Sequence, residues 1–291
     1  MKIVCICEDD TIGNFIRDGL RPDHELPLVI MPEFNASKPR KRHSGTPAKL
    51  LAKLISKVFF SFASRRPSKK ILAQKVENSN KLIADNSKSV SPVESRIPVN
   101  KINSRSTAEL IAKHEPDLMF VCGAPILEKR IFSIPKYGSV NFHFGYSPKY
   151  RGHHGLLWPY LKGDYQHIAG TFLKIDDGVD TGTPLAFVYP EVLGSDTIEN
   201  IEAKVAKMAR GCISPVMNSV AQGCGELQFE TPEKQFQISY ADYGPLVHVK
   251  YVLKQLENCL VARKSVLRSQ YSTINQFQFE NKTAQELQNS A

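Results

Sequence analysis

Short apolar runs alternate with helix-like segments along the chain, and this alternation constrains the fold more than any other feature. The runs cover residues 2–7, 26–31, 118–122, 139–144, 168–175 and 185–189, with a shorter one at 97–99. Helical patterns lie between them over 11–20, 107–114 and 155–162, and a long one begins near residue 196. Apolar strands that alternate with helices predict an α/β fold, with helices flanking a mostly parallel sheet.

The predicted elements divide the chain into two unequal parts. Residues 1–226 form one large α/β domain, with a basic insert at about 36–76, and 227–291 form a small C-terminal region. The tail after about residue 269 is rich in Gln, Asn, Ser and Thr, so we expect it to be poorly ordered. The helix over 107–114 is predicted to begin at a capping box made by Ser106 and Glu109.

The basic insert holds most of the positive charge of the chain. The net charge is +9, and residues 36–76 contain 12 Lys and Arg residues but no Asp or Glu. The remainder of the chain therefore carries a net charge of −3. A single basic block favours a local partner over a general affinity for nucleic acid.

Residues 47–66 of this insert have helical periodicity. Leu51, Leu54, Ile55 and Phe62 fall on one face, and three lysines spaced by four residues share one edge. Such a helix can lie in the interface of an anionic membrane. It can equally pack on the sheet with its lysines in solvent, or contact an acidic protein or a nucleic acid.

The cysteine spacing and the hydropathy pattern indicate where the protein is located in the cell and whether it binds a metal. The six cysteines are spread along the chain without zinc-ligand spacing, which favours reduced thiols, no metal and the cytoplasm. The N-terminus reads as a first strand, not as a secretory signal. No run approaches the roughly 18 apolar residues of a spanning helix, so any membrane contact is expected to be peripheral.

Three polar loops are predicted at the carboxyl edge of the sheet, where α/β proteins bind ligands. Asn141 and His143 are two residues apart on a strand and so share one face, and Asp180 follows a later strand. An amide, an imidazole and a carboxylate together suit acyl transfer to an amine, because they stabilise an oxyanion and move a proton. The alternative is a structural histidine beside a plain hairpin loop.

The run NFHFGYSPKYRGHHG (141–155), followed by IDDGVDTGTPLA (175–186), resembles the 10-formyltetrahydrofolate-dependent formyltransferases. The shared features are Asn-x-His, Pro-x-Tyr-Arg-Gly and a later Asp-x-Gly. The resemblance implies a Rossmann-like catalytic domain, an N-formyltransferase activity, 10-formyltetrahydrofolate as the formyl donor, and no metal. It also implies Asn141, His143 and Asp180 as the catalytic trio. The residues implied to contact the folate are Ile126, Leu127, Asp176, Asp177 and Val179.

The acceptor amine is less constrained, because this chain departs from the family in two places. Phe144 to Ser147 replaces the usual Pro-Ser-Leu-Leu, and Glu8 to Asp10 stands where the purine-pathway enzymes hold a phosphate. These departures favour an amino sugar, nucleotide-linked or free, contacted by Tyr146, Ser147 and Arg151. Methionyl-tRNA and other small amines stay as alternatives, although nucleic acid is disfavoured because no β-rich C-terminal domain is evident. A non-catalytic protein that docks through its basic helix is the remaining alternative, and the oligomeric state stays open.

Overall fold

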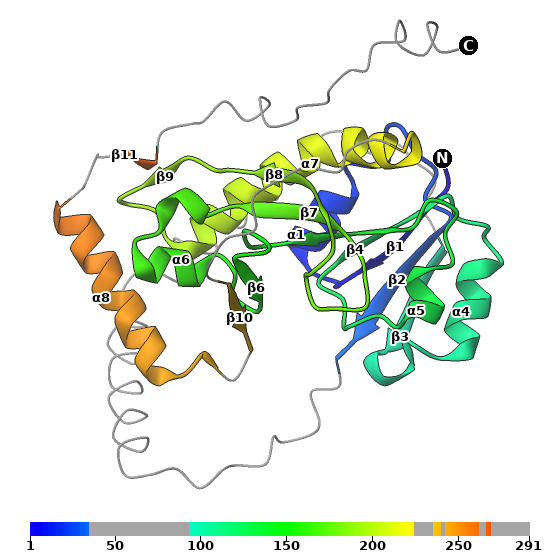
Figure 1. Ribbon diagram of the computed structural model, residues 1–291, viewed down its shortest axis with the longest axis horizontal. Coiled ribbons are helices and arrows are strands. Elements are labelled where there is room, and N and C mark those ends of the chain that lie inside the picture. The colour runs from blue at the N-terminus through cyan, green and yellow to red at the C-terminus, as the bar shows by residue number, and fades with distance from the viewer. Residues whose placement is uncertain (35–92, 224–234, 240–241, 262–265, 269–291) are drawn as a thin grey trace, which may run out of the picture.

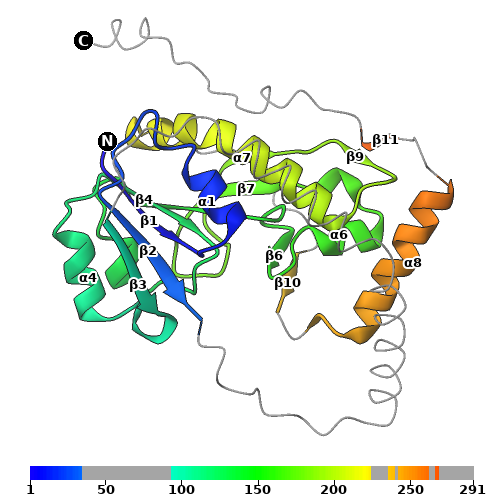
Figure 2. The ribbon, with the colours of Figure 1, turned by 180° about the vertical axis from the view of Figure 1, so that it is seen from behind.

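A mostly parallel sheet runs through the molecule and carries helices on both faces (Figures 1 and 2). The computed structural model describes residues 1–34, 93–223, 235–239, 242–261 and 266–268. Within this part the main sheet has seven strands in the order β3-β2-β1-β4-β5-β7-β8. They are β1 (Ile3–Cys7), β2 (Leu28–Glu33), β3 (Val93–Pro98), β4 (Leu118–Cys122), β5 (Ser139–His143), β7 (Gly170–Lys174) and β8 (Pro184–Val188). The pairs from β3 to β5 are parallel, whereas β7 is antiparallel to both neighbours.

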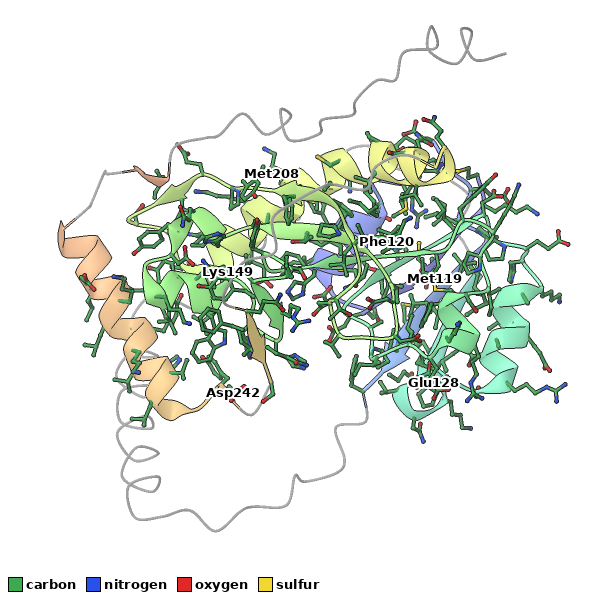
Figure 3. The ribbon with its side chains drawn as sticks, viewed as in Figure 1. Met119, Phe120, Glu128, Lys149, Met208 and Asp242 are labelled. Carbon is green, nitrogen blue, oxygen red and sulfur yellow. The ribbon has the colours of Figure 1, made fainter. Side chains whose placement is uncertain are left out.

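The central strands are apolar throughout because both faces of the sheet are covered. Every residue of β1 is buried, with Cys5 in the cluster that faces α1 (Thr11–Arg17) and α7 (Ile198–Ala221), and Val4 in the cluster that faces α4 (Arg105–Ala112) and α5 (Lys129–Phe132). On β4, Met119 and Phe120 likewise point to opposite clusters (Figure 3). The described helices are α1 (Thr11–Arg17), α4 (Arg105–Ala112), α5 (Lys129–Phe132), α6 (Leu157–Lys162), α7 (Ile198–Ala221) and α8 (Pro245–Val261), with short 3-10 turns η1 (Val99–Lys101) and η2 (Tyr165–His167).

The predicted capping box at the start of α4 is wrong. Ser104 has extended backbone angles and its Oγ accepts a hydrogen bond from the Thr107 amide at 3.3 Å, so the helix begins at Arg105. Ser106 then lies inside the first turn, where it cannot be the N-cap. Within the described residues, the other predicted elements are present with ends shifted by a few residues; α1, for example, ends at Arg17 instead of residue 20.

The C-terminal region adds short elements to the main domain. β10 (Phe236–Ile238) pairs with β6 (Tyr150–Gly152), and β11 (Val266–Arg268) pairs with β9 (Val192–Leu193). The basic insert at 36–76, with its predicted helix, and the tail after residue 269 lie outside the described residues. Among the described helices, none is long and apolar enough to cross a membrane.

Candidate active site

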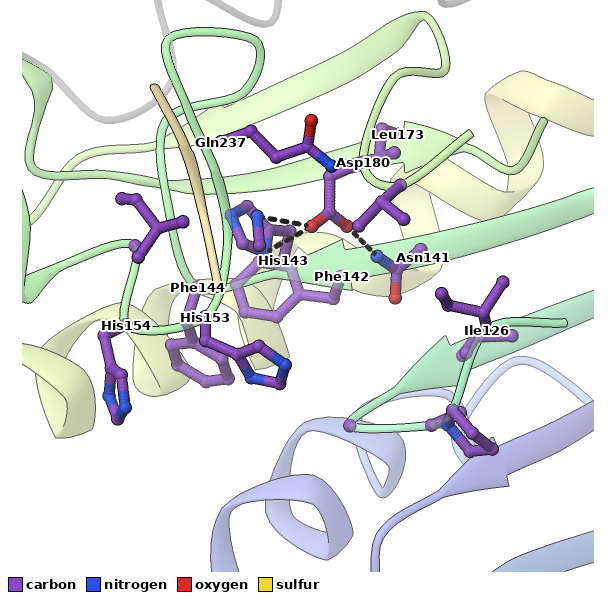
Figure 4. A pocket seen from close by; sticks show the side chains of 18 of the residues that line it. Ile126, Asn141, Phe142, His143, Phe144, His153, His154, Leu173, Asp180 and Gln237 are labelled. Atoms are coloured by element: carbon purple, nitrogen blue, oxygen red, sulfur yellow. Dashed lines mark hydrogen bonds and ion pairs between the residues drawn. The ribbon is translucent and has the colours of Figure 1, made fainter. Parts of the chain in front are cut away.

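Two polar side chains stand on one face of β5. Asn141 and His143 are separated by Phe142, whose ring points to the other face and packs on Phe172 at a centroid distance of 4.7 Å. The strand period of two places the amide and the imidazole side by side (Figure 4).

The carboxylate of Asp180 joins these two side chains. Asn141 Nδ2 donates to Asp180 Oδ1 at 3.0 Å, and His143 Nδ1 lies 3.4 Å from Asp180 Oδ2. The Gly152 amide also donates to Asp180 Oδ2, at 3.0 Å. The predicted convergence of amide, imidazole and carboxylate is therefore present in the structure (Figure 4).

Asp180 reaches this position by a route that differs from the prediction. Because β7 is antiparallel to β5, Lys174 pairs with Val140, and the next loop leaves the sheet beside the amino end of β5. The loop then folds back over the sheet to place Asp180 opposite Asn141 and His143. It is held there by Ser147 Oγ, which donates to the Asp180 carbonyl at 2.5 Å. All three polar loops were expected at the carboxyl edge of the sheet. The loops after β4 and β5 leave that edge, whereas the loop after β7 leaves the opposite edge.

Both ring nitrogens of His143 face oxygen atoms. The ring is 7 % exposed, and Nε2 lies 3.0 Å from the Tyr150 carbonyl oxygen. Since a carbonyl oxygen only accepts, the hydrogen of this bond belongs to Nε2. Nδ1 is consequently the nitrogen that faces Asp180.

The trio lines a cavity of about 1270 Å³. An apolar part of the lining comes from Ile126, Leu127, Ile175 and Val179, and the Ile126 side chain is 67 % exposed. A volume of this size exceeds that of most drug-sized ligand sites, so it has room for two substrates together.

Several carboxylates line the cavity. Glu8, Asp176, Glu202 and Asp242 join Asp180, and the described lining residues include no lysine or arginine. Burial, followed by the charges of Asp10 and Glu199, raises the pKa of Glu202 from 4.5 to about 7. Burial and the Asp10 charge also raise the pKa of Glu8. The cavity thus favours cationic or hydroxyl-rich ligands over anions.

The residues expected on the folate side are mostly at the cavity. Ile126, Leu127, Asp176 and Val179 line it, whereas Asp177 does not. Asp176 Oδ1 accepts from the Gly178 amide at 3.0 Å and from Thr181 Oγ1 at 2.6 Å, which shapes the loop that carries Asp180. Asp177 is exposed at the turn of this loop and is not among the lining residues, so its expected folate contact stays a prediction.

The three residues expected to contact the acceptor lie away from the cavity. Tyr146 stacks on Phe187 at a centroid distance of 4.8 Å. Ser147 is 1 % exposed, and its hydroxyl is occupied by the Asp180 carbonyl. Arg151 lies in β6, opposite Gln237 of β10. The loop after His143 turns inward, so Tyr146 and Ser147 pack against the protein instead of lining the cavity.

The residues that line the opposite side of the cavity were not among the predicted site residues. Glu202 lies on α7, and Gln237 and Asp242 come from the C-terminal region. Glu202 directly follows Ile201 on the buried face of the helix, and a carboxylate beside an apolar stripe was the one available signal. Gln237 reaches the cavity because β10 pairs with β6, and no local sequence pattern predicts this pairing. Within the described residues, no group of three or more His, Cys, Asp or Glu could hold a metal ion.

Comparison with known sequences finds one family. The sequence profile described as "Formyl transferase" matches residues 61–217, which is more than half of the chain. The methionyl-tRNA formyltransferase of Agathobacter rectalis is 30 % identical over 139 residues, which cover 46 % of this chain and 43 % of that protein. The chain thus matches less than half the length of this curated relative.

Comparison with solved structures finds the same fold. A sugar N-formyltransferase from Shewanella sp FDAARGOS_354 aligns with a TM-score of 0.51 and 15 % identity, over 88 % of both chains. A phosphoribosylglycinamide formyltransferase from Anaplasma phagocytophilum aligns with a TM-score of 0.50 and 15 % identity, over 82 % of this chain and 97 % of that one. At these identities the likeness concerns the fold alone.

Proposed function

Since this chain belongs to the formyl transferase family, we propose that it transfers a formyl group from 10-formyltetrahydrofolate to a primary amine. The observation that carries the proposal is the contact of Asn141 and His143 with one carboxylate, that of Asp180, at the wall of a large cavity. This arrangement offers a hydrogen-bond donor and a proton acceptor to one reacting carbon.

The chemistry assigns each side chain a role. The neutral amine attacks the formyl carbon, and the carbonyl oxygen becomes an oxyanion. The Asn141 amide has two N–H groups, of which one is used on Asp180, so the other can donate to the oxyanion. Asp180, with His143 beside it, accepts the proton that the amine nitrogen loses. As the bond between carbon and the folate nitrogen breaks, that nitrogen takes up a proton, and the products are a formamide and tetrahydrofolate.

The donor fits the apolar part of the cavity. Ile126, Ile175 and Val179 present hydrocarbon close to the trio, and a planar pterin ring needs such a surface. We assign the donor to this side, with the formyl group directed to Asn141 and His143.

We assign an amino sugar to the other side. Glu8, Glu202 and Asp242 can accept hydrogen bonds from sugar hydroxyls and attract an ammonium group, whereas they would repel a phosphate. These carboxylates disfavour a ribonucleotide phosphate next to them. It allows a nucleotide-linked sugar whose phosphates extend out of the cavity.

Methionyl-tRNA is the second candidate acceptor. Its support is the match to a methionyl-tRNA formyltransferase together with the 12 cationic residues of the insert, since nucleic-acid binding depends on Lys and Arg contacts to phosphate. The carboxylate-lined cavity argues against it for the part of the acceptor that lies near the reacting amine.

A formyl-transfer assay tests the proposal. Purified full-length protein is incubated with 10-formyltetrahydrofolate and, separately, with a panel of amino sugars and amino-sugar nucleotides, methionyl-tRNA and glycinamide ribonucleotide. We expect a formyl mass gain on an amino sugar, lost in His143→Ala and kept in His114→Ala, whose side chain is not at the cavity. Transfer to methionyl-tRNA alone would select the second candidate. Tetrahydrofolate formation from the donor with no acceptor modified, or no reaction at all, would refute the proposed transfer.

A further inference from the structure

The backbone passes directly beneath the His143 ring at Gly145. A methyl group built on Gly145 would lie 2.4 Å from His143 Nε2 and 2.8 Å from the Tyr150 carbonyl oxygen. Both separations are far below a van der Waals contact, and neither partner is free to move. The ring is buried between hydrogen-bonding groups, and the carbonyl belongs to β6. The observed position of the ring therefore requires a residue without a side chain at 145.

A buried hydroxyl holds Gly145 in this place. Thr171 Oγ1 donates to the Gly145 carbonyl at 2.6 Å and accepts from the Ser147 amide at 3.1 Å. Thr171 is fully buried and lies directly opposite His143 in the β5–β7 pair. The strand that neighbours the imidazole thus also fixes the loop beneath it.

The Tyr150 carbonyl that faces His143 Nε2 is also held in place by buried contacts. Tyr150 is 1 % exposed, and its hydroxyl donates to Asp164 Oδ2 at 2.7 Å. Lys149 Nζ lies 2.9 Å from the same carboxylate oxygen, and His167 lies against the other oxygen. This network anchors β6 from the side away from the cavity, and with it the carbonyl that faces His143.

We propose that Gly145 and Thr171 are positioning residues that lock the Nε2 hydrogen of His143 onto the Tyr150 carbonyl, so that Nδ1 is the ring nitrogen that works with Asp180. The lock removes a 180° ring flip and keeps a hydrogen on Nε2, so Nδ1, 3.4 Å from the Asp180 carboxylate, is the nitrogen that can take up a proton. Its role in transfer rests on the proposed function, whereas its geometry does not.

The first test needs no substrate. NMR of the full-length protein with isotope-labelled histidine reports which ring nitrogen carries hydrogen, and the His143→Ala variant assigns the signal. We expect a slowly exchanging hydrogen on His143 Nε2. A His143 ring with a bare Nε2, or with rapid exchange at Nε2, overturns the proposal.

The second test changes the residue beneath the ring. Gly145→Ala should abolish the slowly exchanging Nε2 signal and lower kcat on the order of 100-fold, since displacement of a reacting group by about 1 Å has such effects. The tetrahydrofolate Kd should stay unchanged. Gly211→Ala is the control, because Gly211 is exposed on α7 and the added methyl meets no atom within 4 Å apart from its chain neighbours and the backbone of its own helix. An unaltered His143 signal in folded Gly145→Ala overturns the proposal.

Thr171→Val keeps the side-chain volume and removes the hydroxyl, so it tests the same lock if Gly145→Ala does not fold. We expect the same loss of Nε2 protection and the same fall in kcat, with the tetrahydrofolate Kd unchanged. An unchanged Nε2 signal in folded Thr171→Val overturns the assignment of Thr171. If the wild-type protein transfers no formyl group but shows the locked Nε2 hydrogen, the proposed function fails and the positioning inference stands.

Discussion

The backbone at Asp180 decides which substitution isolates its carboxylate. Asp180 has a φ of +50°, a left-handed conformation that Asn adopts with little strain and Ala does not. We therefore expect Asp180→Asn to fold normally, to bind tetrahydrofolate, and to lose on the order of 100-fold or more in formyl transfer, since it cannot accept the amine proton. Asp180→Ala should lose a further ~1 kcal/mol in stability. Steady-state kinetics and urea unfolding measure both effects, and near-wild-type turnover in Asp180→Asn would remove Asp180 from the mechanism.

The carboxyl group of Glu202 is expected to make the stability of the protein depend on pH. Its pKa is raised from 4.5 to about 7 in the folded protein, so between these values the folded state holds a proton that the unfolded state has lost. Stability should therefore fall as pH rises through this window, by on the order of 1 to 3 kcal/mol, and stay level above it. Glu202→Gln should lack this decrease and be the more stable protein at about pH 8.

Urea unfolding at about pH 5 and about pH 8 measures the difference. Glu109→Gln is the matched control, because Glu109 is exposed on α4 and pairs only with Arg105 among the described residues. It should keep the wild-type pH dependence. An identical pH dependence in Glu202→Gln would show that Glu202 titrates at its ordinary pKa.

At the scale of single elements, the start of α4 separates the structure from the sequence pattern. Ser104→Ala should lower stability by about 1 kcal/mol, because it leaves the Thr107 amide without its cap. Ser106→Ala should change the free energy of unfolding by only about a few tenths of a kcal/mol, since Ser106 caps no amide in the structure. Thermal unfolding of the two variants compares them directly, and a larger loss in Ser106→Ala would restore the capping box that the sequence suggested.

The sequence predicts those parts of the fold and the site that depend on local residue patterns, and not those that depend on pairing between distant residues. β4 and β5 were predicted to within one residue, because burial on both faces and the alternation around Phe142 are local properties. The sequence predicts that the Asp180 carboxylate meets Asn141 and His143, but not that its loop starts beside the amino end of β5. That start follows from the antiparallel direction of β7, which depends on pairing between residues far apart in the sequence. A motif does not show which side of a loop faces inward, so it does not predict that Tyr146 stacks on Phe187 or that Ser147 donates to the Asp180 carbonyl.

At the scale of the whole molecule, charge is divided between two regions. Residues 36–76 hold 12 cationic residues, whereas the rest of the chain is mildly acidic and the described cavity is lined by carboxylates. An anionic partner would consequently be attracted to the insert and repelled from the cavity. This division is consistent with the proposed amine acceptor at the cavity, and it predicts that an anionic surface is contacted through the insert.

The last prediction is that the full-length protein binds anionic vesicles through residues 47–66. Phosphatidylserine-containing vesicles should retain it, neutral phosphatidylcholine vesicles should not, and retention should weaken as salt rises and shortens the Debye length. Each lysine near such a surface contributes about 1 kcal/mol, so replacing Lys49, Lys53 and Lys57 by Gln should weaken binding on the order of 100-fold. Replacing Lys113, Lys129 and Lys136, exposed lysines outside the insert, changes the net charge equally and should have little effect. Equal retention of the two triple variants would mean that overall charge, and not the segment 47–66, determines the binding.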